Sequence, residues 1–88
     1  MRELMTTAGA EDFELKYFKT TMQSEDGGAI FFGVFVEKHV GGSIVEEMES
    51  GPVCDDDAQI ADIINRLAEG GVTPFALCET LDEMQILA

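Results

Sequence analysis

The sequence predicts an α+β fold, with an antiparallel β-meander of about three strands followed by two C-terminal helices packed on one face. Two observations support this fold class. Aromatic and β-branched residues separated by glycine-containing turns fill the first half, and the apolar spacing becomes helical after residue 52. With 88 residues the chain has the length of one domain. We expect residues 1–12 to be a flexible N-terminal segment and residues 13–88 to form a single α+β domain.

Three runs are typical of strands. They are FELKYFKTTMQ at 13–23, AIFFGVFVEKHV at 29–40 and, more weakly, SIVEEMES at 43–50. Asp26-Gly27 and Gly41-Gly42 separate them and predict hairpin turns, because glycine tolerates a positive φ. Gly51-Pro52 is expected to end the third strand.

A turn centred on Asp26-Gly27 pairs residues whose numbers sum to 53. Opposite charges and apolar partners then match across the first hairpin, as expected of a real register. The four pairs are Lys16 with Glu37, Glu14 with His39, Phe18 with Phe35 and Met22 with Phe31. Pairing across Gly41-Gly42 without a bulge would oppose Glu37 and Glu46, so the register of the third strand stays open.

The second strand is apolar on both faces, whereas a half-exposed strand should alternate with polar residues. Either the N-terminal segment shields the second face, or that face is buried against another copy or a partner. The candidate interface consists of Phe31, Phe35, Phe18 and Met22.

The stretch VCDDDAQI at 53–60 starts the first helix. Ile60, Ile63, Ile64 and Leu67 then lie on one helical face. Asp56 with Gln59 fits a capping box, and Gly70-Gly71 fits a helix end.

Thr73-Pro74 predicts the start of a second helix. Its apolar stripe, which places Cys78 in the core, is Leu77, Cys78, Leu81 and Met84.

No catalytic, cofactor-binding or metal-binding residues are predicted, and we do not expect an enzyme or a bound cofactor. The carboxylates of residues 55–57 do not follow a calcium-loop pattern. No Gly-rich phosphate loop, HExxH or CxxC is present. A dyad or zinc site from Cys54, Cys78 and His39 lacks an orienting group or a fourth ligand. Whether Cys54 is reactive stays open, because a helix N-terminus lowers a thiol pKa while neighbouring carboxylates raise it.

The chain is strongly acidic. Its 18 acidic and 5 basic side chains give a net charge of −13, of which residues 43–88 carry −10. This charge disfavours direct binding to nucleic acid or to an anionic membrane, and any protein partner should be neutral or basic. The two apolar faces of the second strand, and not the charge, favour self-association as a homodimer. The lack of an apolar leader or span and the two separated cysteines predict a cytoplasmic protein.

The succession of TTMQ, FFGVFVEK, SIVEEMES, an acid-capped helix and VTPFALCETLDEM resembles a family of short uncharacterised bacterial proteins, clostridial in type. The resemblance spans about residues 13–84 and is carried by Gly33, by Val72-Thr73-Pro74 and by Leu77. Members of that family often carry a His directly before the Leu of the last helix, where this chain has Ala76. The resemblance implies a domain of unknown function in a bacterial cytoplasm, with no assigned activity.

The function therefore stays unknown at the level of sequence. The leading interpretation is a small acidic, non-enzymatic protein-interaction or regulatory module that associates with itself. The alternative is an acidic nucleic-acid mimic that binds a basic protein, and a Cys/His metal or redox protein has less support.

Overall fold

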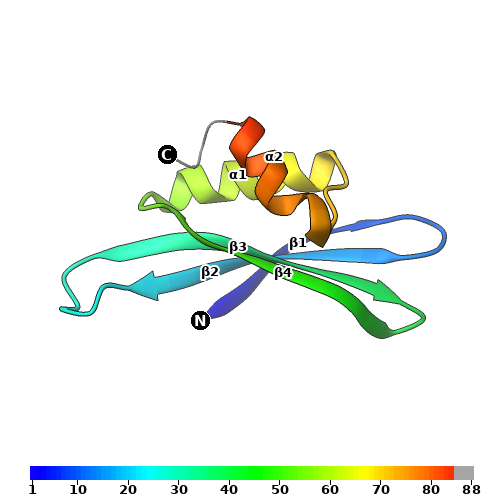
Figure 1. The fold of residues 1–88 in the computed structure, drawn as a ribbon, viewed down its shortest axis with the longest axis horizontal. Helices are drawn as coiled ribbons and strands as arrows, with labels where there is room; N and C mark the ends of the chain where they lie inside the picture. Colours follow the sequence, from blue (N-terminus) through cyan, green and yellow to red (C-terminus); the bar gives the residue numbers. More distant parts are fainter. Residues whose placement is uncertain (85–88) are drawn as a thin grey trace.

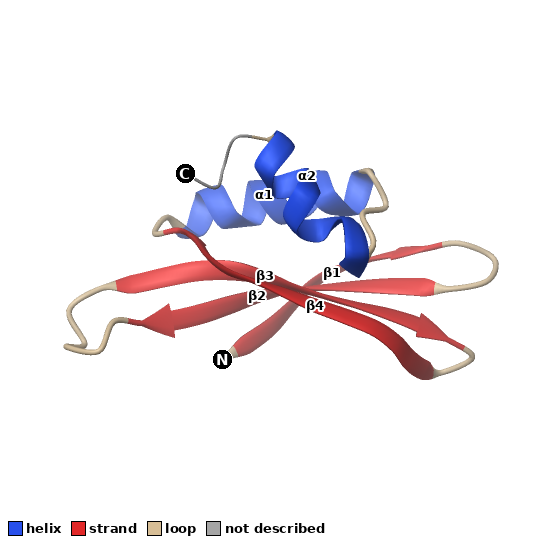
Figure 2. Cartoon of the chain, viewed as in Figure 1, coloured by secondary structure: helices blue, strands red, loops and turns tan. Residues whose placement is uncertain are grey.

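The computed structural model describes residues 1–84, which form a four-stranded antiparallel sheet with a layer of helices on one face (Figures 1 and 2). The strands lie side by side in sequence order, as in a meander. The elements are β1 (Arg2–Gly9), β2 (Glu14–Gln23), β3 (Ile30–Val40), β4 (Ser43–Cys54), α1 (Asp57–Glu69), the 3₁₀ turn η1 (Pro74–Ala76) and α2 (Leu77–Glu83).

The α+β class, the antiparallel sheet and the two C-terminal helices are confirmed, but the prediction of about three strands is wrong. The additional strand, β1, comes from the segment 1–12 that we expected to be flexible. It forms an edge of the sheet beside β2, with a bulge at Met5. Residues 85–88 of the predicted domain lie outside the described residues.

The β2–β3 hairpin has the predicted register, since all four predicted pairs are Cα partners. The polar side chains of these pairs, however, contact partners on their own strands. Lys16 Nζ lies 3.9 Å from Glu14 Oε1, and His39 Nε2 lies 3.0 Å from Glu37 Oε1.

A bulge at Val45 sets the β3–β4 register. The turn at Gly41-Gly42 has positive φ angles of 59° and 85°, and the ladder slips by one residue between Lys38 and His39. Lys38 therefore faces Glu46, and their charged atoms lie 3.8 Å apart. Because a slip of one residue exchanges the two faces of a strand, the bulge also turns Met48 toward the helices.

β4 continues through Gly51-Pro52 to Cys54, beyond the predicted strand end. Two further irregularities permit this, between Gly33 and its neighbours in β3. Gly51 has a φ of 76°, and a Cβ on Gly33 would collide with the Gly51 carbonyl oxygen. The Ser50 hydroxyl accepts a hydrogen bond from the Val34 backbone N–H at 3.0 Å, so a side chain replaces the ladder bond that the bend removes.

The core lies between the sheet and the helices. Tyr17 is fully buried there, and its hydroxyl donates a 2.7 Å hydrogen bond to the carbonyl of Val72 in the loop after α1. This bond ties the helical layer to the middle of the sheet. The other buried apolar side chains of the core are Leu15, Val34, Val36, Ile60, Ile63, Ile64, Leu67, Leu77 and Leu81.

The first helix begins and ends at the predicted caps, although Asp56 bonds to Ala58 and not to Gln59, the partner in the predicted capping box. The Asp56 carboxylate caps α1 by accepting a bond from the Ala58 N–H at 3.0 Å, and Gly71 takes a φ of 60° after Gly70. Thr73 holds the N-cap position of η1, although its side chain makes no capping bond. Cys78 is exposed, so its predicted place in the core is wrong. Leu77 and Leu81 alone carry the buried stripe of α2, and Cys78 is rotated by about 100° from Leu77.

Replacing Tyr17 by Phe should lower the free energy of unfolding by about 1–2 kcal/mol, because the Val72 carbonyl loses its partner while the ring still fills the core. Burial also raises the pKa of Tyr17 from 10.0 to about 12. Between these values the unfolded phenol ionises while the folded one stays protonated, so wild-type stability falls as the pH rises. Urea unfolding across this pH range should show that the difference in free energy of unfolding between the wild type and Tyr17→Phe becomes smaller. A difference that stays constant from pH 9 to 12 would contradict the raised pKa of the buried Tyr17 hydroxyl.

Replacing Gly33 by Ala should destabilise the fold by about 2–3 kcal/mol, because the new Cβ meets a backbone carbonyl that cannot turn aside. Thr20 Oγ1 and Met22 Cε would also lie within 2.8 and 2.9 Å of it. Gly9→Ala in β1 is the matched control, since a Cβ there meets nothing within 4 Å. Urea midpoints measure both variants, and equal midpoints would show that β4 can move away from β3.

Candidate functional site

The sheet face away from the helices is uncovered in the described chain, and we call it the open face. Cross-strand rows follow from the register and the alternation of side chains. From the end nearest the β2–β3 turn, its rows are Met22–Phe31, Arg2–Thr20–Gly33–Pro52, Leu4–Phe18–Phe35–Glu49, Thr7–Lys16–Glu37–Glu47 and Gly9–Glu14–His39–Ile44. The rows change from apolar to charged along the strands.

The four predicted interface residues all lie in the apolar half of the open face. The rings of Phe18 and Phe35 are 5.7 Å apart and tilted by 55°. The Arg2 guanidinium lies 3.7 Å from the centre of the Phe35 ring, and Arg2 also lies 3.5 Å from Glu49. Phe35 is therefore only 3% exposed. β1 thus shields the centre of this face, as one of the two sequence interpretations expected.

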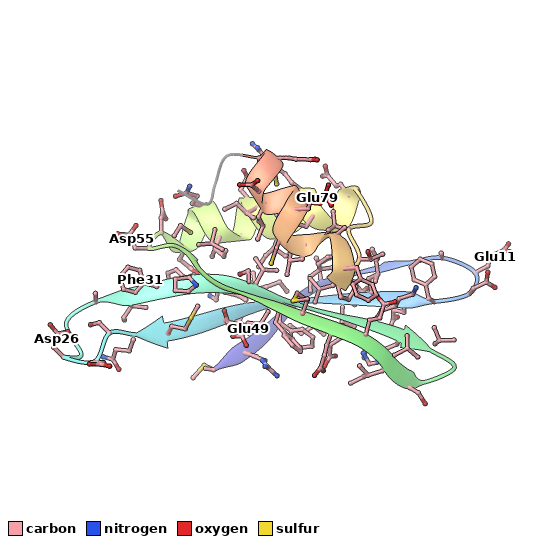
Figure 3. All side chains as sticks on the ribbon, viewed as in Figure 1. Glu11, Asp26, Phe31, Glu49, Asp55 and Glu79 are labelled. Atoms are coloured by element: carbon pink, nitrogen blue, oxygen red, sulfur yellow. The ribbon has the colours of Figure 1, made fainter. Side chains whose placement is uncertain are left out.

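Apolar surface remains on both sides of that covered centre. Phe31 is 36% exposed and Leu4 is 51% exposed. Between them lies Thr20, whose buried hydroxyl has no hydrogen-bond partner within residues 1–84. Glu49 marks this side of the sheet in Figure 3, where the helices lie on the other side.

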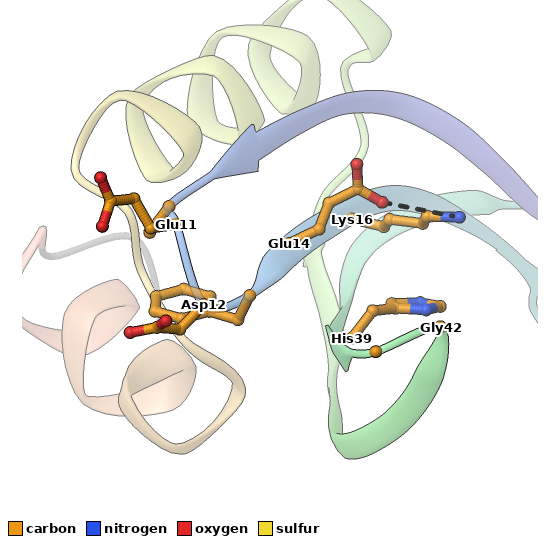
Figure 4. A pocket seen from close by; sticks show the side chains of 9 residues that line it. Glu11, Asp12, Glu14, Lys16, His39 and Gly42 are labelled. Atoms are coloured by element: carbon orange, nitrogen blue, oxygen red, sulfur yellow. Dashed lines mark ion pairs between the residues drawn. The ribbon is translucent and has the colours of Figure 1, made fainter.

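The charged half of the open face borders a shallow hollow of about 520 Å³ (Figure 4). Lys16, Glu14 and His39 line it, together with the β1–β2 and β3–β4 turns. Glu11 and Asp12 point away from the Lys16 and His39 side chains (Figure 4). Glu11 and Asp12 therefore do not join Lys16 and His39 at a common point in this hollow.

Cys54 and His39, which the sequence left as a conceivable dyad, are not brought together. Cys54 pairs with Phe32 on the helix face, whereas His39 lies on the open face. Phe32 and His39 are seven positions apart along β3, which corresponds to about 23 Å. Within residues 1–84, no group of three His, Cys, Asp or Glu side chains is arranged to hold a metal ion. The Cys54 thiol lies 3.5 Å from the Asp56 carbonyl oxygen at the start of α1.

Each of the five basic side chains forms an ion pair within the fold. The most enclosed is Lys19, which lies 2.7 Å from Asp57 and 3.8 Å from Glu3. The hydrogen bond to Asp57 holds the pKa of Lys19 above its usual value. The remaining pairs are Arg2–Glu49, Lys16–Glu14, Lys38–Glu46 and Arg66–Asp62. Most carboxylates are left without a basic partner, so the surplus negative charge lies on the surface.

The sequence missed three residues of these surfaces. Arg2 and Leu4 lie in the segment that we took to be flexible. Phe75 is 80% exposed beside the buried Pro74, although Pro74 itself was recognised as a helix start. No signal in the sequence alone places Phe75 outside the core, because it lies between apolar residues.

Fold and surfaces together define a small α+β domain with a four-stranded meander and two C-terminal helices. The chain belongs to DUF6514, a family of unknown function, whose sequence model matches residues 2–87. No curated protein and no solved structure matches the chain significantly. Among the described residues, no helix is long and apolar enough to span a membrane.

Proposed function

We propose that this chain is a small acidic protein-interaction module that self-associates through the open face. The observation that carries the proposal is the apolar half of that face. It gathers Phe18, Phe35, Met22, Phe31 and Leu4 on a sheet surface that no helix within residues 1–84 covers.

The size of the open face supports this proposal. The long axis of the molecule, 43 Å, runs along the strands (Figure 1). The open face spans all four strands along this axis, and an interface of standard size takes about 800 Å² from each partner. Sheets pack face to face by burying such apolar rows.

The charge of the open face supports a second copy as the partner. Its rows hold four carboxylates and two bases, a net charge of −2, whereas the whole chain carries −13. Two copies therefore repel each other least when these faces meet. Arg2 and Glu49 lie beside the apolar centre and supply opposite charges to the rim of such a contact.

Replacing Phe31 by Asp should convert the dimer into a monomer, because it places a charge in the apolar half of the interface. Phe31 is exposed enough for the monomer to stay folded, whereas Phe35 is too buried for this test. Sedimentation velocity over a concentration series measures the change, and circular dichroism checks the fold. We expect the dissociation constant to rise by at least about tenfold.

Phe75→Asp is the matched control, since it adds the same charge to an exposed Phe on the opposite side of the sheet. It should leave the dimer unchanged. A wild-type protein that stays monomeric at high concentration would overturn self-association. A dimer that survives both Phe31→Asp and Leu4→Asp would overturn this interface.

A second candidate function is to mimic a nucleic acid and so bind a basic protein. This function is favoured because all five Lys and Arg side chains pair with carboxylates of the same chain, which leaves the surplus carboxylates for a basic partner. Carboxylates without a basic partner include Asp55, Glu69 and Glu79, of which Asp55 and Glu79 lie in and beside the helical layer (Figure 3). We expect a partner captured from native lysate on the immobilised protein to be released both by raised salt and by excess duplex DNA. A captured partner that excess DNA leaves bound would contradict mimicry.

A further inference from the structure

The free edge of β4 differs from the open face and has its own apolar surface. β4 is the last strand of the sheet, so one side of its backbone carries N–H and C=O groups that no strand pairs. Val45 and Met48 on this strand are 53% and 37% exposed. Such an edge can accept an additional strand from another chain.

A groove runs beside this edge on the side of the helices. Its volume is about 190 Å³. Pro74 is buried and anchors η1 against the sheet, which holds the neighbouring Phe75 outward at 80% exposure. The groove is lined by Val45, Glu46, Glu47, Met48, Pro74 and Phe75. An apolar side chain from an added strand would find a preformed place between Met48 and Phe75.

The carboxylates along β4 favour a bound segment that carries positive charge. Glu47 lies directly opposite Glu37, and no basic residue within residues 1–84 forms an ion pair with it. Like charges in opposed positions destabilise a sheet, so a cation on the far side of Glu47 would relieve this pair. Glu49 lies in the same face of β4, two residues further on.

A second copy of this chain is a poor occupant of the edge. Antiparallel pairing of two β4 strands about Met48 would oppose Glu47 and Glu49 of different copies. Pairing β4 of one copy with β1 of the next would make a head-to-tail contact, which builds an open filament unless the rotation between copies closes a ring. The edge therefore suits a foreign segment with positive charge.

We propose that the β4 edge and the Phe75 groove bind an extended segment of a partner protein in which basic and apolar residues alternate. The segment adds a fifth strand to the sheet. Its basic side chains lie opposite Glu47 and Glu49 on the open face, and the apolar side chain between them lies opposite Met48 and enters the groove. This site gives the proposed interaction module a class of partner. Its backbone edge and groove lie outside the apolar half of the open face, and it shares only the border residues Glu47 and Glu49 with that face.

The test uses a fluorescent decapeptide of alternating Lys and Val as the probe, with the full chain at low salt. Fluorescence anisotropy should show saturable binding. A peptide of the same composition with its Lys and Val in two separate blocks should bind at least about tenfold more weakly, because it cannot present both residue types in register. An alternating Glu–Val peptide should not bind.

Two variants locate the site. Phe75→Asp and Glu47→Lys should each weaken binding of the alternating peptide by at least about tenfold. Both residues are exposed, and circular dichroism confirms that the variants fold. Phe31→Asp should abolish self-association and leave peptide affinity unchanged, so the two proposals fail independently.

Three results would overturn the proposal. Equal affinity for the alternating and block peptides would show attraction to charge alone. Unchanged affinity in Phe75→Asp would remove the groove. Loss of self-association in Phe75→Asp, without peptide binding by the wild type, would show that another copy occupies the edge.

Discussion

The close approach of β4 to β3 at Gly33 determines where the helices lie over the sheet. Because Gly33 has no side chain, the carbonyl of Gly51 can occupy the space above it. The positive φ of Gly51 then turns the chain, and the Ser50 hydroxyl satisfies the Val34 N–H that the bend leaves behind. The redirected chain reaches Asp56, which caps α1 over the helix face. The Tyr17–Val72 hydrogen bond holds the far end of that layer to the sheet.

The close approach of β4 to β3 at Gly33 also helps to explain which parts of the fold could be predicted from the sequence. The β2–β3 register is readable because its partners are close in sequence and match in charge and apolarity. The extension of β4 is not readable, since Gly51-Pro52 breaks a strand unless a residue 18 positions earlier makes room for it. β1 was missed because a bulge interrupts a polar strand, whose stability comes from pairing with β2. Cys78 was misplaced because α2 has only two buried positions, Leu77 and Leu81.

The candidate surfaces were predictable to different degrees for a related reason. Phe18, Met22, Phe31 and Phe35 belong to one hairpin, so their shared face follows from local pairing. Their exposure does not follow, because Arg2 comes from a strand outside that hairpin and covers Phe35. The β4 groove depends on contact between β4 and η1, which are separated by all of α1. No pattern within either segment indicates that contact.

The distribution of charge favours different partners for the two proposed contact surfaces. All five Lys and Arg side chains already pair with carboxylates of the same chain. Two copies therefore present surplus negative charge to each other over most of their surface and repel. The open face carries little net charge, and burial of its apolar rows would stabilise contact between copies. The β4 edge combines unpaired backbone groups with the Glu37–Glu47 opposition, which a second copy would aggravate and a basic strand would relieve. The two proposed contacts therefore favour different partners, and they meet at Glu47 and Glu49, which lie on the open face and border the β4 edge.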